Sequence, residues 1–201
     1  MTSGDEKTSV WTLPNRLSFV RILFIPAIIY LISTRQEQSL LAACILFIIA
    51  GITDGLDGLI ARRMGMKTRL GLYLDPIADK LLVSCVLITL SSYGLVPLWV
   101  TLILVAREFL INGLRSFYAA EGVTIYSSYS GKLKTTFQII AISCILFSRY
   151  WDTGRYWASF QTAGLVLIYV ALFFSLFSAY QYVRAILQKS SGSRGPARRT
   201  E

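Results

Sequence analysis

Four aspartates lie close together in a chain that is otherwise rich in apolar residues. Asp54 and Asp57 are three positions apart, and Asp75 and Asp79 are four positions apart. Either spacing places two side chains on one face of a helix. Four carboxylates that converge in an apolar setting would repel one another unless cations lay between them. The pattern therefore indicates a cation-binding site.

The available ligand types narrow the choice of cation. The chain contains no histidine, and its three cysteines, Cys44, Cys85 and Cys144, lie in separate apolar segments. Oxygen ligands without nitrogen or sulfur favour hard divalent cations, Mg²⁺ or Mn²⁺. Four carboxylates can hold two such ions, and paired ions assist in-line displacement at phosphorus. The absence of histidine also excludes Ser-His-Asp triads and imidazole acid–base chemistry.

Small and phosphate-binding residues accompany the aspartates. Gly55, Gly58 and Gly71 carry no side chain, so a ligand can approach the backbone beside the acids. Arg62 and Thr68 supply a guanidinium fork and a hydroxyl, and both groups suit phosphate oxygens. The alternative is that the acids only pair with neighbouring basic residues at a solvated boundary. Four acids at helical spacings together with three glycines favour the binding site.

A second basic set lies downstream and could surround a compact anion. Arg107 and Arg115 are eight positions apart, close to two helical turns, and Lys132 and Lys134 stand at the start of another apolar segment. Guanidinium and ammonium groups both bind phosphate. As an alternative, the lysines and Arg115 would only meet anionic lipid headgroups. Arg107 lies deeper in its apolar segment, beside Glu108, and buried arginines are usually paired or functional.

The composition indicates that these residues are positioned by membrane helices. Of 201 residues, 54% are apolar and 15% are charged, whereas soluble domains average about 25% charged residues. The mean hydropathy is +0.56 and the net charge is +9. The basic residues lie between and beside apolar segments, so a membrane surface and anionic phosphate ligands explain them better than nucleic acid does.

The apolar segments predict an all-α integral membrane protein with six transmembrane helices and a short N-terminal interfacial helix over residues 11–16. No cleavable signal peptide is expected. The domain organisation predicted is a flexible N-terminus (1–10), a membrane domain (11–188) and a disordered basic tail (189–201). The predicted spans cover residues 17–33, 40–63, 71–90, 96–118, 131–147 and 156–187.

The distribution of basic residues predicts the orientation of these spans. Six spans place both termini on one side of the membrane, and most of the lysines and arginines fall on that side. By the positive-inside rule, both termini and the aspartates face the cytoplasm, in the inner (plasma) membrane of a cell.

The aspartate stretch resembles the signature of the CDP-alcohol phosphotransferase family, D-x2-D-G-x2-A-R-x8-G-x3-D-x3-D. The resemblance implies six transmembrane helices, a homodimer, a two-metal site at the cytoplasmic boundary and a CDP-linked donor. All eight fixed positions of the signature are present: Asp54, Asp57, Gly58, Ala61, Arg62, Gly71, Asp75 and Asp79.

The same resemblance implies roles for individual residues. Asp54, Asp57 and Asp75 correspond to metal ligands, and Asp79 corresponds to an acid that is both a metal ligand and the general base. The residues implied in binding the donor, CDP-diacylglycerol, are Asn15, Ser18, Gly58, Ala61, Arg62, Thr68 and Gly71.

The segments "LPNRLSFVRILFIP", "AREFLINGLRSF" and "GKLKTT" resemble one branch of the family, whose acceptor is sn-glycerol 3-phosphate. The implied reaction gives phosphatidylglycerophosphate and CMP, with Arg107, Arg115, Lys132 and Lys134 binding the acceptor phosphate. Inositol phosphate, serine or phosphatidylglycerol as acceptor remain alternatives within the same chemistry. A divalent-cation transporter is a remote alternative, because a conduit needs polar groups through the whole bilayer depth and the acids cluster at one side. A purely structural membrane scaffold would not need the complete signature.

Overall fold

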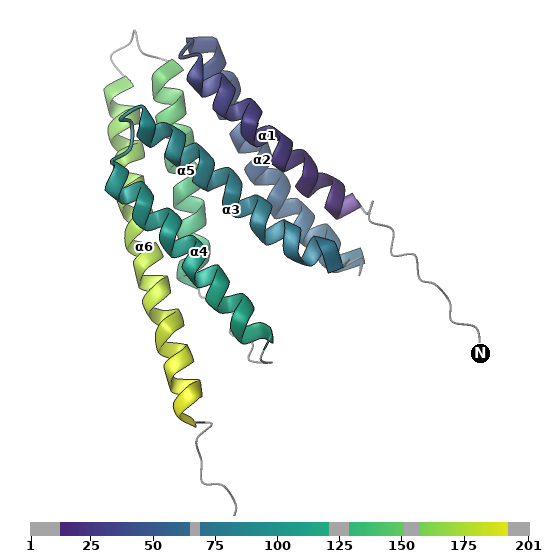
Figure 1. Cartoon of the computed structure of the whole chain (residues 1–201). Coiled ribbons are helices and arrows are strands. Elements are labelled where there is room, and N and C mark those ends of the chain that lie inside the picture. Colours follow the sequence, from purple (N-terminus) through teal and green to yellow (C-terminus); the bar gives the residue numbers. More distant parts are fainter. Residues whose placement is uncertain (1–12, 65–68, 121–128, 151–156, 193–201) are drawn as a thin grey trace, which may run out of the picture.

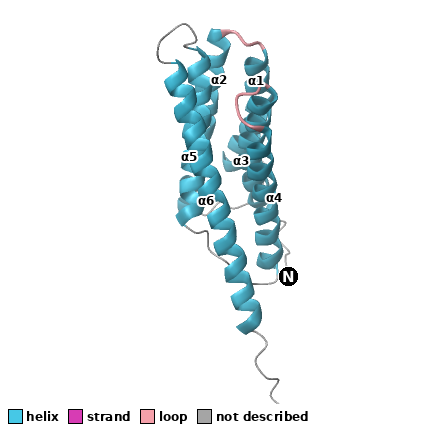
Figure 2. Ribbon diagram, turned by 90° about the vertical axis from the view of Figure 1, so that its left-hand side faces the viewer, coloured by secondary structure: helices cyan, strands magenta, loops and turns pink. Residues whose placement is uncertain are grey.

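Six helices that alternate in direction make up the described part of the chain (Figure 1, Figure 2). The structure, a computed structural model, describes residues 13–64, 69–120, 129–150 and 157–192, with side chains for 19–53, 80–119, 131–149 and 158–188. This part contains no strand, which agrees with the predicted all-α class. The helices are α1 (Leu13–Ser33), α2 (Glu37–Met64), α3 (Arg69–Ser92), α4 (Leu98–Ala120), α5 (Tyr129–Tyr150) and α6 (Trp157–Gly192).

Two helix boundaries differ from the sequence-based prediction. Residues 13–16, predicted to belong to a separate interfacial helix, form the first turn of α1 instead. Pro14 is compatible with this continuation, because a proline in the first turn of a helix breaks no intrahelical hydrogen bond. At the other end α6 continues to Gly192, past the predicted start of the tail at residue 189. Residues 1–12 and 193–201 lie outside the described part.

The helices pack as a closed ring whose order differs from the order in the sequence. The helix contacts give the order α1–α3–α4–α6–α5–α2, and α2 packs back against α1. α3 also contacts α5 across the ring. This order brings α3, α4, α5 and α6 around one interior, so side chains far apart in the sequence can meet there.

A glycine turn sends α4 back along α3. Gly94 has a φ of 70°, in the left-handed region, where a residue without Cβ meets no steric penalty. Its N–H donates to the Ser91 carbonyl (2.9 Å), and the Leu95 N–H donates to the Leu90 carbonyl (3.0 Å). These two bonds form a Schellman motif that ends α3. The motif lies between the predicted spans 71–90 and 96–118, and α4 returns toward the end of the bundle at which α3 begins.

The interior of the ring is an apolar core to which every helix contributes. Its buried side chains are mostly branched aliphatic, so the helices are held by close packing. The three cysteines, which come from α2, α3 and α5, have free thiols. One fully buried side chain from each helix in turn is Ile28, Phe47, Leu87, Val100, Ile142 and Ile168.

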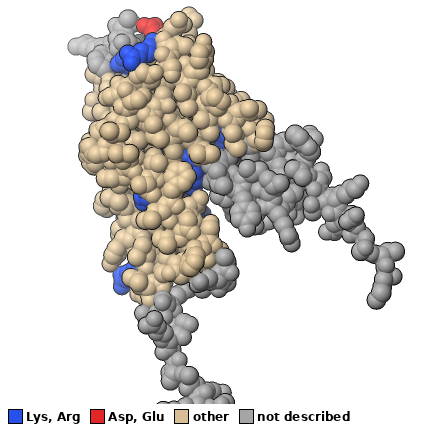
Figure 3. All heavy atoms as spheres, in the orientation of Figure 1, with Lys and Arg blue, Asp and Glu red and all other residues tan. Residues whose placement is uncertain are grey.

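The described surface is largely uncharged. Figure 3 shows lysine and arginine at only a few points on one face, and large apolar side chains such as Leu23, Leu110 and Phe173 are exposed. One described helical segment, Ala158–Gln188, is long and apolar enough to cross a membrane, with 31 residues and a mean hydropathy of 2.1. Shorter apolar segments are Phe19–Ser33, Glu37–Thr53 and Lys80–Ser92. The six predicted helices are therefore present, and one of them meets the length and composition of a membrane span.

Candidate active site

The four aspartates lie on two helices that are consecutive in the chain. Asp54 and Asp57 are in the C-terminal half of α2, and Asp75 and Asp79 are in the N-terminal half of α3. Both segments are helical, so the spacings of three and four residues place each pair of positions on one helix face. The helical setting predicted for the aspartates is confirmed, while their side chains lie outside the described part.

The two aspartate pairs come to the same end of the bundle, toward which α2 and α3 slope down to the right in Figure 1 and which is called the lower end below. α2 ends at Met64 and α3 begins at Arg69, five positions later. Five Cα–Cα steps of about 3.8 Å allow these two helix ends to be at most about 19 Å apart. In addition, α1 packs against both α2 and α3.

The residues predicted to bind the donor occupy the same three helices. Thr68 lies outside the described residues. The others are in the first two turns of α1, in the last turns of α2 and in the first turn of α3, all at the lower end of the bundle. They are Asn15 and Ser18 on α1, Gly58, Ala61 and Arg62 on α2, and Gly71 on α3.

The donor chemistry of the aspartate region fits hard divalent cations. It offers carboxylate oxygens from two helices whose ends are joined by a short connection, which is the ligand type that Mg²⁺ and Mn²⁺ prefer. Among the side chains that the structure describes, no group of three or more His, Cys, Asp or Glu could hold a metal. The predicted ligands Asp54, Asp57, Asp75 and Asp79 lie outside the side chains that the structure describes.

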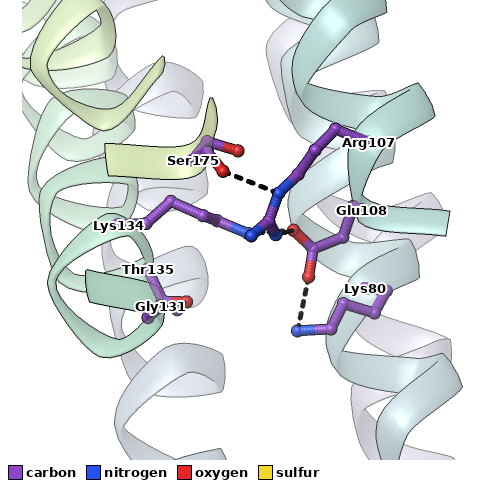
Figure 4. A network of polar contacts seen from close by, with 7 residues as sticks. All are labelled: Lys80, Arg107, Glu108, Gly131, Lys134, Thr135 and Ser175. Carbon is purple, nitrogen blue, oxygen red and sulfur yellow. Dashed lines mark hydrogen bonds and ion pairs between the residues drawn. The ribbon is translucent and has the colours of Figure 1, made fainter. Parts of the chain in front are cut away.

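Glu108 on α4 lies at the centre of an ion-pair cluster (Figure 4). Its Oε1 is 2.8 Å from Lys80 Nζ, and its Oε2 pairs with Lys134 Nζ and lies 3.3 Å from Arg107 Nη1. The three cations come from α3, α5 and α4. One carboxylate thus connects three helices of the ring at a single point, which we call the Glu108 cluster.

The Glu108 cluster extends to a fourth helix and is shielded from solvent. Arg107 Nε donates to the backbone carbonyl of Ser175 on α6, at 2.9 Å. Only 5% of the Lys134 side chain, 11% of Arg107, 13% of Glu108 and 21% of Lys80 is exposed. Charges so poorly exposed interact more strongly than they would in water, so the groups hold one another in place.

A small cavity of about 20 Å³ lies beside the cluster. It has room for about one water molecule. Its apolar lining comes from α3 and α4, and its polar lining comes from α3, α4 and α5. The polar and charged residues are Lys80, Ser84, Glu108, Lys134, Thr135 and Gln138.

Comparisons with known proteins identify the family. Residues 11–186, most of the chain, match the family described as CDP-alcohol phosphatidyltransferase. The chain belongs to the CDP-alcohol phosphatidyltransferase family.

Several curated relatives carry the name CDP-diacylglycerol--glycerol-3-phosphate 3-phosphatidyltransferase. The Bacillus subtilis protein is 37% identical over 185 residues, with 86% of this chain and 94% of the relative covered. The Rickettsia typhi protein is 38% identical over 173 residues (86% and 96%), and the Escherichia coli K12 protein is 33% identical over 180 residues (87% and 94%).

Within this CDP-alcohol phosphatidyltransferase, the four predicted acceptor-binding residues are placed differently. Arg107 and Lys134 meet in the Glu108 cluster. The Arg115 guanidinium instead lies over the ring of Tyr182 on α6, 5.8 Å from the ring centroid. Lys132 is exposed. The structure thus brings two of the four residues together through Glu108.

The sequence alone gives no reason to group Lys80 and Glu108 with the predicted acceptor-binding residues. Glu108 directly follows Arg107 and Lys80 directly follows Asp79, so the sequence predicts each only as a partner of residues nearby in the chain. A single acid within an otherwise apolar segment was the available signal for Glu108. No spacing rule links positions 80, 108 and 134, because their contact depends on the ring order of the helices.

Proposed function

We propose that this enzyme transfers a phosphatidyl group from CDP-diacylglycerol to sn-glycerol 3-phosphate, releasing phosphatidylglycerophosphate and CMP. It would thus act as a phosphatidylglycerophosphate synthase in phospholipid biosynthesis. The observation that carries the proposal is the complete eight-position signature on α2 and α3, in a chain whose curated relatives are named for this reaction. The Glu108 cluster adds cations suited to a phosphate-bearing acceptor.

The donor is held at the lower ends of α1, α2 and α3. Arg62 and Thr68 bind diphosphate oxygens, and Gly58 and Gly71 let the nucleotide approach the backbone. Asn15, Ser18 and Ala61 complete the contacts to CDP-diacylglycerol. Two divalent cations, Mg²⁺ or Mn²⁺, held by the four aspartates would neutralise the diphosphate and stabilise the charge that develops at the phosphorus under attack.

Asp79 is the general base of the proposed reaction. Its carboxylate takes the proton from the acceptor hydroxyl, and the oxygen attacks the lipid-linked phosphorus in line with the leaving group. One P–O bond forms to the acceptor, the P–O bond to CMP breaks, and the electron pair leaves with CMP. Asp54, Asp57 and Asp75 act through metal affinity, whereas Asp79 also sets the rate of proton transfer.

The acceptor phosphate is bound by the downstream basic residues. Arg107 and Lys134 are supported by their convergence in the Glu108 cluster. Arg115 and Lys132 lie on the same two helices, and they supply further positive charge toward the lower end. A neutral or zwitterionic acceptor such as serine has less need of these cations, so they favour glycerol 3-phosphate over such acceptors.

The proposal also places the protein in the membrane. All six helices span the bilayer of the inner (plasma) membrane, and both termini and the active site face the cytoplasm, because the basic residues concentrate on that side. The exposed apolar side chains of the helices face lipid or a second copy of the chain, which acts as a homodimer.

A matched panel of acceptors tests the proposal. Purified protein with CDP-diacylglycerol and Mg²⁺ is offered sn-glycerol 3-phosphate, inositol 1-phosphate, serine and phosphatidylglycerol, and both CMP and the lipid product are measured. We expect CMP release and phosphatidylglycerophosphate with glycerol 3-phosphate only. Turnover with only one of the other acceptors would contradict glycerol 3-phosphate as the acceptor, while the phosphatidyltransferase reaction would stand. Metal flux into liposomes without CMP release would contradict the proposed enzymatic activity and would favour a divalent-cation transporter.

A further inference from the structure

Lys80 and Lys134 converge on one carboxylate although they belong to different helices. Lys80 Nζ is 2.8 Å from Glu108 Oε1, and Lys134 Nζ pairs with Glu108 Oε2 (Figure 4). The two oxygens of a carboxylate share one carbon, so the two ammonium groups approach the same small region. Arg107 reaches it from a third direction, at 3.3 Å from Oε2. The two ammonium groups and the guanidinium together carry more N–H donors than one carboxylate can accept, so the same cations also suit the oxygens of a phosphate.

The Glu108 cluster is ordered by the protein itself. Lys80, Glu108 and Lys134 line a cavity with room for about one water, and polar side chains of Thr135 and Gln138 complete the lining. Both ammonium groups are therefore held close together by protein contacts, and little side-chain entropy is lost when they bind an anion. Fixing binding groups before the ligand arrives is a common source of affinity.

Lys80 also connects the cluster to the chemistry. It directly follows Asp79 on α3, and successive helical residues differ by only about 1.5 Å along the helix axis. The proposed base and the Lys80 position thus lie at the same depth in the bundle. An acceptor whose phosphate is bound near Lys80 can present a hydroxyl a few bonds away to Asp79.

We infer that Lys80 is a further acceptor-phosphate-binding residue, and that Glu108 is a positioning residue that holds Lys80 and Lys134 together for this phosphate. The inference rests on the proposed function and names two residues of its acceptor site. The alternative is that Lys80 only stabilises the packing of α3 against α4 through its ion pair with Glu108.

Steady-state kinetics of Lys80→Gln, Lys80→Met and Lys80→Arg test this assignment. With the Gln and Met variants we expect the KM for sn-glycerol 3-phosphate to rise about tenfold or more, because a hydrogen bond to a charged group is lost. The KM for CDP-diacylglycerol stays within about twofold, which corresponds to well under the energy of one such bond. Lys80→Arg retains the charge and recovers most of the loss. Arg149→Gln, which removes a charge at the opposite end of α5, serves as the matched control and leaves both KM values unchanged.

Inorganic phosphate separates a binding role from a structural one. As a competitive inhibitor against glycerol 3-phosphate, it should lose affinity in Lys80→Met by the same factor as the acceptor does. An unchanged acceptor KM would overturn the inference, and so would a loss of kcat with an unchanged inhibition constant for phosphate. Either outcome counts if it is found in Lys80→Gln or Lys80→Met, whichever of the two folds better. Wild-type protein without any turnover of glycerol 3-phosphate contradicts the proposed function itself, and with it this assignment. If the wild-type protein turns over glycerol 3-phosphate and the Lys80 variants have the same acceptor KM, only the assignment of Lys80 is contradicted and the proposed function stands.

Discussion

The aspartate region and the Glu108 cluster are adjacent in the fold but are assembled in different ways. The aspartates span 26 consecutive residues, from Asp54 to Asp79, on two helices joined by a short connection. The partners in the cluster are far apart in the chain: Lys134 and Glu108 are separated by 26 positions, and Arg107 and Ser175 by 68. The first region depends on local helix geometry, and the second depends on how four helices pack.

This difference suggests a division of labour between the two regions. In the proposed reaction, the aspartates would serve the donor diphosphate and the proton transfer, which the reaction requires with any acceptor. The Glu108 cluster would serve the phosphate of the acceptor. Perturbing the aspartate region should therefore lower kcat for all acceptors, whereas perturbing the cluster should raise the KM for a phosphate-bearing acceptor.

Removal of divalent cations should have the largest effect. Exhaustive dialysis against EDTA is expected to lower CMP release by at least about a thousandfold, because metal ions contribute several kcal/mol to phosphoryl transfer. Added Mg²⁺ or Mn²⁺ should restore the activity. Circular dichroism in detergent should show the same helical content throughout, because the apolar core holds the helices. Substantial turnover in the protein freed of metal would contradict the proposal that the aspartates bind catalytic metal ions.

The Asp79→Asn variant should come next. Loss of the general base is expected to lower kcat by about 10²–10⁴-fold, the usual contribution of positioned proton transfer. The KM for glycerol 3-phosphate should change far less, because the cations of the cluster are intact. CMP release measured over a range of acceptor concentrations gives both parameters. Near-normal kcat in a folded Asp79→Asn variant would exclude Asp79 as the base.

The sequence predicts the helical setting of the four aspartates well because helix spacing is a local property. Asp54 and Asp57, and likewise Asp75 and Asp79, are related by less than two turns of one helix, so their faces can be read from position alone. The six helices follow equally from runs of apolar residues. Helix ends are weaker predictions, since the polar residues near 189–192 still continue α6.

The Glu108 cluster could not be predicted in the same way. Apolar residues cover most faces of these helices, so the sequence does not reveal which helices are neighbours. Only the ring order shows that α3, α4, α5 and α6 share an interior. Lys132 and Lys134 illustrate the limit, because the sequence treats them alike while only Lys134 is buried beside Glu108.

That pair of lysines provides the third prediction. Lys134→Gln is expected to raise the KM for glycerol 3-phosphate about 10–100-fold, since a buried ammonium that contacts an anion contributes about 1.5–3 kcal/mol. Lys132→Gln, which changes an exposed side chain on the same helix, should raise it about threefold or less. Both variants should keep the KM for CDP-diacylglycerol. Equal effects would show that the cluster does not set acceptor affinity.

The smallest effects are expected outside both regions, where a substitution should change stability and leave the kinetics alone. Gly164 on α6 lies against α5, and an added Cβ there would be 2.6 Å from Ile145 Cγ1 and 3.1 Å from the Ala141 carbonyl oxygen. Gly164→Ala should therefore destabilise the fold by about 1–3 kcal/mol through overpacking. Gly113 on α4 is the matched control, because no described atom lies within 4 Å of an added Cβ.

Gly113→Ala should be neutral or stabilising by up to about 1 kcal/mol, because alanine loses less backbone entropy in a helix. Thermal unfolding in detergent compares the two variants, and acceptor KM is measured on the same samples. A lower midpoint for Gly164→Ala with an unchanged KM would show that α5–α6 packing supports the fold without tuning the acceptor site. A raised KM would mean instead that the position of α5, and so of Lys134, depends on this contact, and the separation between the apolar core and the cluster would fail.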